Sequence, residues 1–167
     1  MEHRGDAVSA ADERAFLAAA IDLARENIAR GGRPFGAMVV KDGAIVATGV
    51  NEILATHDPT AHAEMAAIRA ASRKLGSADL SGCRVYASGH PCPMCLAAIR
   101  IAGVSAVAFA YSNQDGEPFG LSTAAIYADL ARPLAEQSME IRHVPAADAP
   151  RPTLYAEWQC VQGTRTG

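Results

Sequence analysis

The sequence predicts an α/β fold in which a mixed sheet carries helices on both of its faces. Helical and extended patterns alternate along the chain, and turn signals separate short strands. The 167 residues suit one domain with a core of ordinary size. With 50% hydrophobic and 20% charged residues, the composition is that of a globular protein. We therefore expect a single domain over residues 1–167.

The first half of the chain shows the patterns of two helices around a hairpin. Ser9 followed by Asp12 resembles an N-terminal cap, and Gly31-Gly32 ends the helix that follows. Asp42-Gly43 is a strong tight-turn signal between two strands, and Pro59 disfavours helix in the loop before the second helix. The predicted elements are a helix over about 9–30, strands over 35–40 and 44–50, a loop over 52–60, and a helix from about 60 to 75. The inward faces of the helices are Phe16, Leu17, Ala20, Ile21, Ala24 and Ile28, and Met65, Ile68, Ala71 and Leu75.

The second half of the chain continues with shorter elements. Gly82 precedes a third strand, and Pro91 precedes a helix that begins beside Cys92. The run from Val104 to Tyr111 is almost wholly apolar, as expected for a strand buried on both faces. The predicted elements are strands over 83–87, 104–111 and 139–144, and helices over about 93–102, 123–130 and 153–162. Together with the hairpin, they give a five-stranded mixed sheet.

Charge and hydropathy argue against two classes of partner. The net charge of −3 offers no broad basic surface for nucleic acid, and no apolar run is long enough to cross a membrane. Residues 1–6 are polar and lead into no apolar segment of a secretory signal, and we expect residues 1–8 to be disordered. Cys92 and Cys95 have a spacing typical of metal or redox chemistry in a reducing compartment. These features predict a cytoplasmic protein with a small-molecule substrate.

Two short stretches carry the chemistry. They are His62-Ala63-Glu64 and Pro91-Cys92-Pro93-Met94-Cys95. One histidine and two cysteines are three ligands of the kind that hold a catalytic zinc ion with one position left open. Zinc lowers the pKa of a bound water from ~15.7 toward ~7, so hydroxide becomes available near neutral pH. H-x-E followed by P-C-x-x-C is the signature of zinc deaminases that act on nucleobases.

Glu64 is too close in sequence to His62 to be a ligand from the same helical turn, and it is well placed to move protons. It can take a proton from the water and pass it to the ring and then to the leaving amine. Such general acid–base work contributes roughly 10²–10⁴ in rate. A redox pair is disfavoured because no thioredoxin-like pattern precedes Cys92, and a zinc ribbon would need a second cysteine pair.

From about Pro34 to Tyr111 the chain resembles the cytidine and deoxycytidylate deaminase superfamily, most closely its guanine deaminases. The residues that carry the resemblance are Pro34-Phe35-Gly36-Ala37, Asn51, the run from Asp58 to Glu64, and the run from Pro91 to Leu96. The resemblance implies a three-layer α/β/α sandwich, zinc on the histidine and the two cysteines, and Glu64 as proton shuttle. It also implies a homodimer in which a C-terminal segment covers the partner's site.

Four residues near the two motifs are candidates for binding the base. Asn51 matches the family asparagine that hydrogen-bonds the base, or it closes a strand as a turn residue. Phe35 either stacks on the base or fills the core, and Ala63 can offer its backbone N–H. His90 stands where much of the family has glutamate. It can hydrogen-bond a substrate or a partner, or be a tolerated loop residue; a role as fourth ligand is disfavoured.

The loop after the fourth strand and the C-terminal tail also bear on the choice of substrate. Guanine deaminases carry an acidic pair where this chain has Ser122-Thr123, so another acceptor is needed for the N–H groups of guanine. The candidates are Asp115, Glu117 and Glu157. Residues 153–167 are expected to form a lid or a swapped segment in which Glu157 and Trp158 contact the substrate. The alternative is a last helix packed on its own core.

Hydrolytic deamination of an aminated ring, with release of ammonia, is the function that these features predict, and guanine to xanthine is the leading case. The alternative is a deaminase of another free base, a nucleoside or an aminated triazine, with cytosine, guanosine and adenine among the rings. A tRNA adenosine deaminase needs clustered Lys and Arg at the phosphates, and the last 25 or so residues offer no such cluster. A non-catalytic zinc-stabilised binding module belongs to a different class, and the intact Glu64 argues against it.

Overall fold

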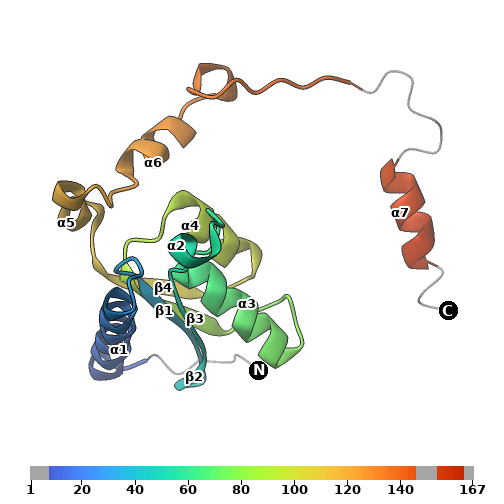
Figure 1. Cartoon of the computed structure of the whole chain (residues 1–167). Coiled ribbons are helices and arrows are strands. Elements are labelled where there is room, and N and C mark those ends of the chain that lie inside the picture. Colours follow the sequence, from blue (N-terminus) through green and yellow to red (C-terminus); the bar gives the residue numbers. More distant parts are fainter. Residues whose placement is uncertain (1–7, 146–153, 164–167) are drawn as a thin grey trace. The chain divides into compact units, whose positions relative to one another are not determined.

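The computed structural model describes residues 8–145 and 154–163 of the chain (Figure 1). Contacts between residues divide the chain into two compact units, Met1–Ala131 and Arg132–Gly167. The first unit contains the sheet and the helices that cover it. No helix in these two described ranges is long and apolar enough to span a membrane. The predicted disorder of residues 1–8 falls, apart from Val8, outside the described residues.

Four strands form one mixed sheet, as the sequence predicts for the class of fold. They are β1 (Gly36–Lys41), β2 (Ala44–Val50), β3 (Cys83–Gly89) and β4 (Ala106–Tyr111), in the order β2-β1-β3-β4. β1 runs antiparallel to both β2 and β3, and β3 runs parallel to β4. The predicted turn joins β1 to β2, because Asp42 (φ 49°) and Gly43 (φ 74°) both adopt the left-handed backbone that a tight hairpin needs.

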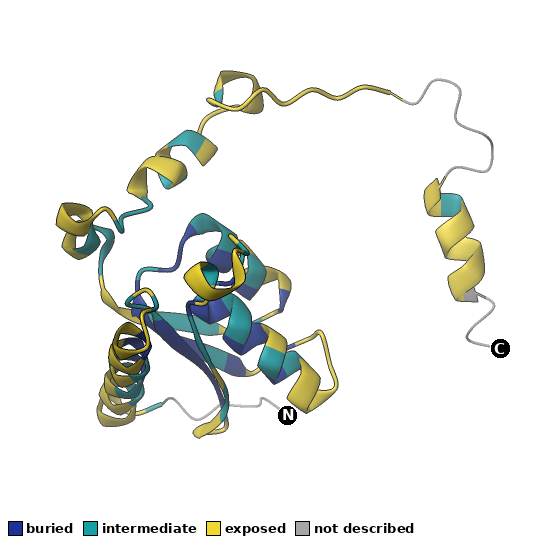
Figure 2. Ribbon diagram, viewed as in Figure 1, coloured by how far each residue is buried: buried dark blue, intermediate teal, exposed yellow. Residues whose placement is uncertain are grey.

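Helices cover both faces of the sheet and make three layers. α1 (Ala10–Ala29) lies on one face, and α3 (Ala63–Leu75) and α4 (Pro93–Ile101) lie on the other (Figure 1). Side chains of β1 alternate between them: Ala37 and Val39 pack with α3, and Met38 and Val40 pack with α1. Figure 2 shows the buried residues gathered along the sheet and the helix surfaces that face it.

Local sequence explains where α1 and α4 begin and where α3 ends. The side chain of Ser9 accepts the Asp12 N–H and caps α1, and Gly76 ends α3 in the left-handed conformation (φ 64°). Cys92 is the N-cap of α4, and Pro93 occupies its first turn. The remaining helices are α2 (Ile53–Thr56), α5 (Asn113–Gly116), η1 (Glu117–Phe119), α6 (Ala124–Leu130), η2 (Leu134–Glu136) and α7 (Leu154–Gly163).

Two strand glycines allow the helices to approach the sheet closely. A Cβ on Gly49 would lie 2.6 Å from the backbone nitrogen of Ala67 in α3. A Cβ on Gly36 would lie 2.5 Å from the carbonyl oxygen of Ala20 in α1. Real Cβ atoms do not come this close, so any side chain at either position would push a helix away from the sheet.

The predicted fifth strand over residues 139–144 is wrong. The sheet of the described residues has four strands, and Met139, Ile141 and Val144 are exposed by 65%, 41% and 77%. The alternation of apolar and polar residues in this segment suits a strand, but a strand forms only where a neighbouring edge accepts its backbone hydrogen bonds. Alternation alone does not show that such an edge is within reach.

Three burial predictions also need correction. Leu75, predicted on the inward face of α3, is 38% exposed at the last residue of that helix. β4 is an edge strand, and its residues are partly or fully exposed, with Tyr111 exposed by 52%. It is therefore not buried on both faces. On α1 the inward face ends at Asn27, which is 5% exposed, and Ile28 is 52% exposed. Ala20, Ala24 and Asn27 share one face at helical spacing. The sequence prediction chose Ile28 for this face because it is hydrophobic, but the buried residue of the last turn is Asn27.

Candidate active site

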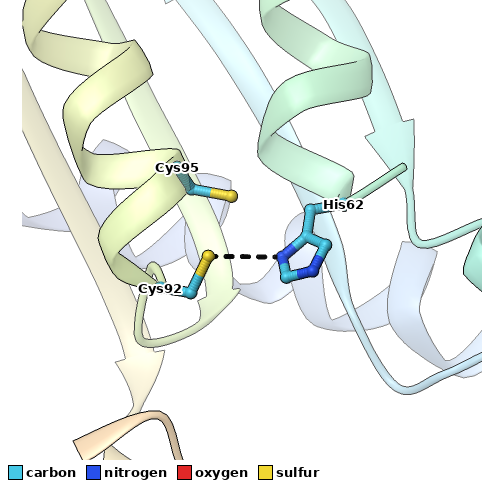
Figure 3. A group of neighbouring side chains, drawn as sticks. All are labelled: His62, Cys92 and Cys95. Carbon is cyan, nitrogen blue, oxygen red and sulfur yellow. Dashed lines mark hydrogen bonds between the residues drawn. The ribbon is translucent and has the colours of Figure 1, made fainter. Parts of the chain in front are cut away.

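The N-termini of α3 and α4 bring the three predicted ligands together. His62 is the N-cap of α3, Cys92 is the N-cap of α4, and Cys95 lies in the first turn of α4. Figure 3 shows their side chains pointing toward one another. The Sγ atom of Cys92 lies 3.5 Å from Nδ1 of His62, and one potential ligand atom from each residue falls within 4.8 Å of the others.

This donor set fits a zinc ion. Nitrogen and sulfur ligands lie about 2.0–2.3 Å from zinc, so in a tetrahedron they stand about 3.3–3.8 Å apart. The 3.5 Å separation between Cys92 and His62 is within that range. Three protein ligands leave a fourth position for water or substrate, which is the arrangement of a catalytic zinc site.

Glu64 lies beside the ligands, in the first turn of α3. Its carboxylate is 6% exposed, and Oε2 accepts a hydrogen bond of 3.5 Å from the Cys95 thiol. Burial raises the pKa of Glu64, because water no longer solvates the charged form. A carboxyl whose pKa is raised in this way takes up a proton more readily than an exposed carboxyl does, and it can then return that proton.

In the metal-free chain the pKa values of the two thiols are shifted in opposite directions. The hydrogen bond from Cys95, followed by the one from His62, lowers the pKa of Cys92 to about 4. The pKa of Cys95 is raised, first by its interaction with the Cys92 sulfur and then by burial. The hydrogen bond to Cys92 also raises the pKa of His62. Zinc binding must therefore displace protons that the metal-free cluster holds.

Asn51 is held at the end of β2 with one part of its side chain uncommitted. It is 3% exposed, its Oδ1 accepts the Ile53 N–H (3.2 Å), and its own N–H donates to the Phe35 carbonyl (3.1 Å). Within the described ranges no acceptor is recorded for its Nδ2 group. The next residue, Glu52, donates to the Ala61 carbonyl (2.9 Å), one residue before His62. Asn51 is thus tied to the loop that carries the first ligand.

Phe35 packs against the core and also lines a cavity. The two roles predicted for it, filling the core and offering a surface to a base, are therefore compatible. Its ring covers Gly89, where an added Cβ would lie 3.0 Å from the ring. It packs against the core beneath α3 and also lines a cavity of about 500 Å³ together with His90. The lining of that cavity contains none of the three predicted ligands.

His90 is an aromatic packing partner at the turn before Cys92. Its ring centroid lies 4.5 Å from that of Phe109 and 5.5 Å from that of Tyr127. The backbone N–H of His90 donates to the Tyr111 carbonyl (2.8 Å). His90 does not belong to the group of potential metal ligands found among the described residues.

The loop after β4 uses its polar groups internally. Ser112 donates both its N–H and its hydroxyl to Oδ2 of Asp115 (2.7 Å each), and these bonds lower the pKa of that carboxyl, the hydroxyl bond most. Thr123 donates its N–H and its hydroxyl to Oδ1 of Asn113 (3.0 and 3.3 Å). Asp115, one of the predicted acceptors for a base, is thus occupied as a helix cap. Glu117 is exposed.

The predicted tail residues lie on α7, in the second unit. Glu157 is exposed, and Tyr155 and Trp158 are exposed by 83% and 63%. The helix itself is confirmed, since the sequence places it over 153–162. The contacts of Glu157 and Trp158 with a substrate stay predictions.

Three polar residues that shape the site escape sequence reasoning. Asn27 bonds to the backbone at Asn51, Ser88 accepts the Gly36 N–H (3.0 Å), and the Tyr127 hydroxyl donates to the Pro91 carbonyl (2.5 Å). Only Asn27 gives a usable signal, as a lone polar residue on the apolar face of a helix. Serine and tyrosine at the other two positions look like ordinary strand and helix residues.

Comparison with known proteins agrees with this geometry. The family model of the cytidine and deoxycytidylate deaminase zinc-binding region matches residues 10–111. The chain belongs to this deaminase family. The family region binds zinc, and among the described residues His62, Cys92 and Cys95 are the group placed to hold it. We conclude that the protein is a zinc-dependent deaminase.

The family members most similar to this chain include guanine deaminases. Guanine deaminase of Bacillus subtilis (strain 168) is 44% identical over 130 residues, which cover 77% of this chain and 83% of the relative. The crystal structure of the B. subtilis enzyme has a TM-score of 0.75, with 38% identity, and the match covers 100% of this chain and 96% of that one. The structure of guanine deaminase from Nitrosomonas europaea has a TM-score of 0.64, with 34% identity. The match covers 70% of this chain and 68% of that one.

A more distant match is a tRNA-specific adenosine deaminase of Aquifex aeolicus. It is 39% identical over 94 residues, which cover 56% of this chain and 62% of the relative. The family therefore spans more than one substrate, and the local contacts of the site must distinguish between them.

We expect zinc affinity to fall as the pH is lowered. Because the pKa values of Cys95 and His62 are raised in the metal-free chain, each zinc bound must release at least one proton. Chelator competition at pH 6, 7 and 8 should show about a tenfold or larger loss of affinity per unit of pH. Cys83→Ala, at a buried thiol outside the site, is the matched control for Cys92→Ala, which should weaken binding at every pH. Affinity independent of pH would contradict the proton displacement.

Proposed function

We propose that the protein hydrolyses guanine to xanthine and ammonia. The buried Glu64 carboxylate beside the cluster of His62, Cys92 and Cys95 is the observation that carries the hydrolytic reaction. The similarity to guanine deaminases supports the choice of guanine. A clustering of lysine and arginine suited to a tRNA is not evident in the sequence, which has a net charge of −3.

In this proposal His62, Cys92 and Cys95 hold the zinc ion, and Glu64 moves the protons. Zinc bound there supplies an activated water at neutral pH. Glu64 accepts one proton from the attacking water and delivers it to a ring nitrogen. It then takes the second proton of the same oxygen, which becomes the carbonyl oxygen of the product, and delivers that proton to the amine, which leaves as ammonia. Its raised pKa suits both directions of transfer, because the protonated and ionised forms are then closer in free energy at neutral pH.

We also propose how the base is bound. The uncommitted Nδ2 of Asn51 donates to an acceptor on the ring, and the backbone N–H of Ala63 serves as a second donor, because the first N–H groups of a helix have no partner within it. The ring of Phe35 offers an apolar surface to the base. His90, beside the second motif, limits the size of the ring that can enter.

One observation favours a second candidate, the deamination of another aminated ring. Guanine presents a ring N–H and an amine that need an acceptor in a buried site, and each unpaired donor costs about 1–3 kcal/mol. Ser122-Thr123 replaces the acidic pair of guanine deaminases, and Asp115 is already occupied by Ser112. A loop without this acidic pair suits a ring that offers fewer donors, such as cytosine or an aminated triazine.

The substrate can be identified by following ammonia release from guanine, guanosine, cytosine, cytidine, adenine and aminated triazines. We expect the highest kcat/KM with guanine. Thr123→Asp should raise kcat/KM for guanine by about tenfold if a missing acceptor limits it. Ser138→Asp adds the same charge in the second unit and serves as control. Turnover of cytosine without turnover of guanine would replace guanine by the second candidate.

We expect Glu64→Gln to lower kcat by about 10²–10⁴ while the zinc content stays at the wild-type level. The glutamine keeps the shape of the side chain and removes its ability to take up a proton. Because burial raises the pKa of Glu64, ionisation opposes folding of the metal-free chain above the ordinary pKa of the carboxyl. The metal-free variant should therefore melt a few degrees higher at pH 8, and the difference should shrink as the pH falls.

The control for this variant is Glu26→Gln, on the exposed side of α1, which should change neither kcat nor the zinc content. Substantial turnover by Glu64→Gln with zinc bound would remove the assigned role of Glu64 as proton carrier.

We further propose a homodimer in which the C-terminal segment of one chain closes the site of the other. Leu154 and Trp158 lie one turn apart on α7, form an apolar stripe and are exposed by 75% and 63%. A ten-residue helix with such an apolar stripe is stable only against a partner. β4 also leaves an apolar edge with Phe109 and Tyr111 exposed. In the dimer Glu157 supplies the carboxylate that the loop after β4 lacks, and Trp158 covers the base.

We propose that this enzyme acts in the cytoplasm. None of its four cysteines, all within the described residues, forms a disulfide, and the metal site needs reduced thiols.

Sedimentation of the full chain should show a dimer, and a chain that ends at Arg151 should be a monomer with kcat/KM reduced by about tenfold or more. The reason is that the shortened chain loses both the apolar stripe and the proposed lid. Trp158→Ala should raise KM in the full chain, and Gln159→Ala, a change on the same helix outside the stripe, should not. A monomeric full chain whose kinetics are unchanged by the truncation would contradict the proposal.

A further inference from the structure

We propose that Asn27 is a positioning residue that sets where Asn51 meets the base. The proposal rests on the base-binding role given to Asn51 above. Asn27 lies on α1, on the opposite face of the sheet from the helices that carry the metal ligands. It is 5% exposed and is one of four buried polar or charged side chains within the described residues.

The amide of Asn27 joins two segments that are distant in sequence. Its Nδ2 donates to the carbonyl of Arg33 and to the carbonyl of Asn51, each at 2.8 Å. The amide nitrogen carries two hydrogens, and both are used. The side chain therefore fixes the loop after α1 and the end of β2 at the same time.

A closed ring of hydrogen bonds results. The Asn51 N–H donates to the Phe35 carbonyl (3.1 Å), and the Phe35 N–H donates to the Arg33 carbonyl (2.8 Å). Asn27 closes this ring by its bonds to Arg33 and Asn51. The backbone on both sides of Phe35 and the backbone of Asn51 are therefore set by one side chain that is not expected to touch the substrate.

Gly32 leaves space for the side-chain amide of Asn27. The Gly32 N–H donates to the main-chain carbonyl of Asn27 (2.8 Å), which keeps residue 32 next to that side chain. A Cβ on Gly32 would lie 2.6 Å from both Cγ and Oδ1 of Asn27. The chain thus leaves room at residue 32 for the amide alone, and a methyl group there would displace it.

This arrangement fixes the direction of the uncommitted donor on Asn51. The carbonyl of Asn51 is held by Asn27, its N–H by Phe35, and its Oδ1 by the Ile53 N–H. With these three groups held, the side chain of Asn51 has one orientation, and that orientation sets the direction of its Nδ2 group. Releasing the Asn51 carbonyl would let the donor drift, and a displacement of about 1 Å in a reacting complex can cost about a hundredfold in rate.

The test is a double-mutant cycle between Asn27→Ala and Asn51→Ala, with guanine or the ring that gives the highest turnover in the screen. We expect Asn27→Ala to lower kcat/KM by about 10- to 100-fold, mainly through a higher KM, with zinc content unchanged. In the Asn51→Ala background the same substitution should cost less than about twofold, because its effect passes through Asn51. A purely structural role would lower the active fraction and leave KM unchanged.

Two further variants keep the test decisive. Asn27→Ser, which retains one short donor, replaces Asn27→Ala if the alanine variant does not fold. Gly32→Ala displaces the amide without removing it and should reproduce the rise in KM. Tyr86→Phe is the matched control, since it removes a buried polar group from the same interface of α1 with the sheet, and its hydroxyl has no partner among the described residues. It should leave KM unchanged.

The outcomes separate the two proposals. If Asn51→Ala leaves kcat/KM unchanged, Asn51 does not bind the base, and the proposed recognition fails. If Asn51→Ala lowers kcat/KM but the effect of Asn27→Ala is fully additive to it, recognition by Asn51 stands and positioning by Asn27 is refuted.

Discussion

The contact between His62 and Cys92 is the interaction on which the site depends. The two residues are thirty positions apart in sequence and cap two different helices, yet their ligand atoms lie 3.5 Å apart. Two helix N-termini therefore face the same point, and their partial positive charges favour the thiolate of Cys92. The parallel pairing of β3 with β4 and the close seating of α3 on β2 serve to keep these helix ends together.

The chemistry and the recognition of the base are built by different parts of the fold. The metal ligands and Glu64 come from α3 and α4, on one face of the sheet. Asn51 and Phe35 lie at the ends of strands, and their backbone is anchored to α1 on the other face. The residues that carry the reaction and those that orient the ring are thus supported separately, which allows a family to keep one reaction while its substrates differ.

The sequence predicts the reaction better than the surroundings of the site, for physical reasons. His62, Glu64, Cys92 and Cys95 are found because zinc and proton transfer demand particular side chains at particular spacings. The helices α1, α3, α4 and α7 follow from periodicity and caps. The fifth strand was predicted wrongly because residues 139–144 alternate as a strand does, and alternation does not reveal a pairing partner. Asn27, Ser88 and Tyr127 act by hydrogen bonds to distant backbone groups. Asn27 stands out in the sequence only as a polar residue on an apolar helix face, and Ser88 and Tyr127 leave no local pattern.

Gly36 and Gly49 have a consequence for how this chain can vary over evolution. They lie on neighbouring strands and admit helices on opposite faces at distances that no other amino acid permits. A larger residue at Gly49 would lift α3 and draw His62 away from the cysteines, so the first property lost would be metal retention. Sequence drift at these two positions is therefore limited by the zinc site, although neither glycine comes near the metal ligands in sequence.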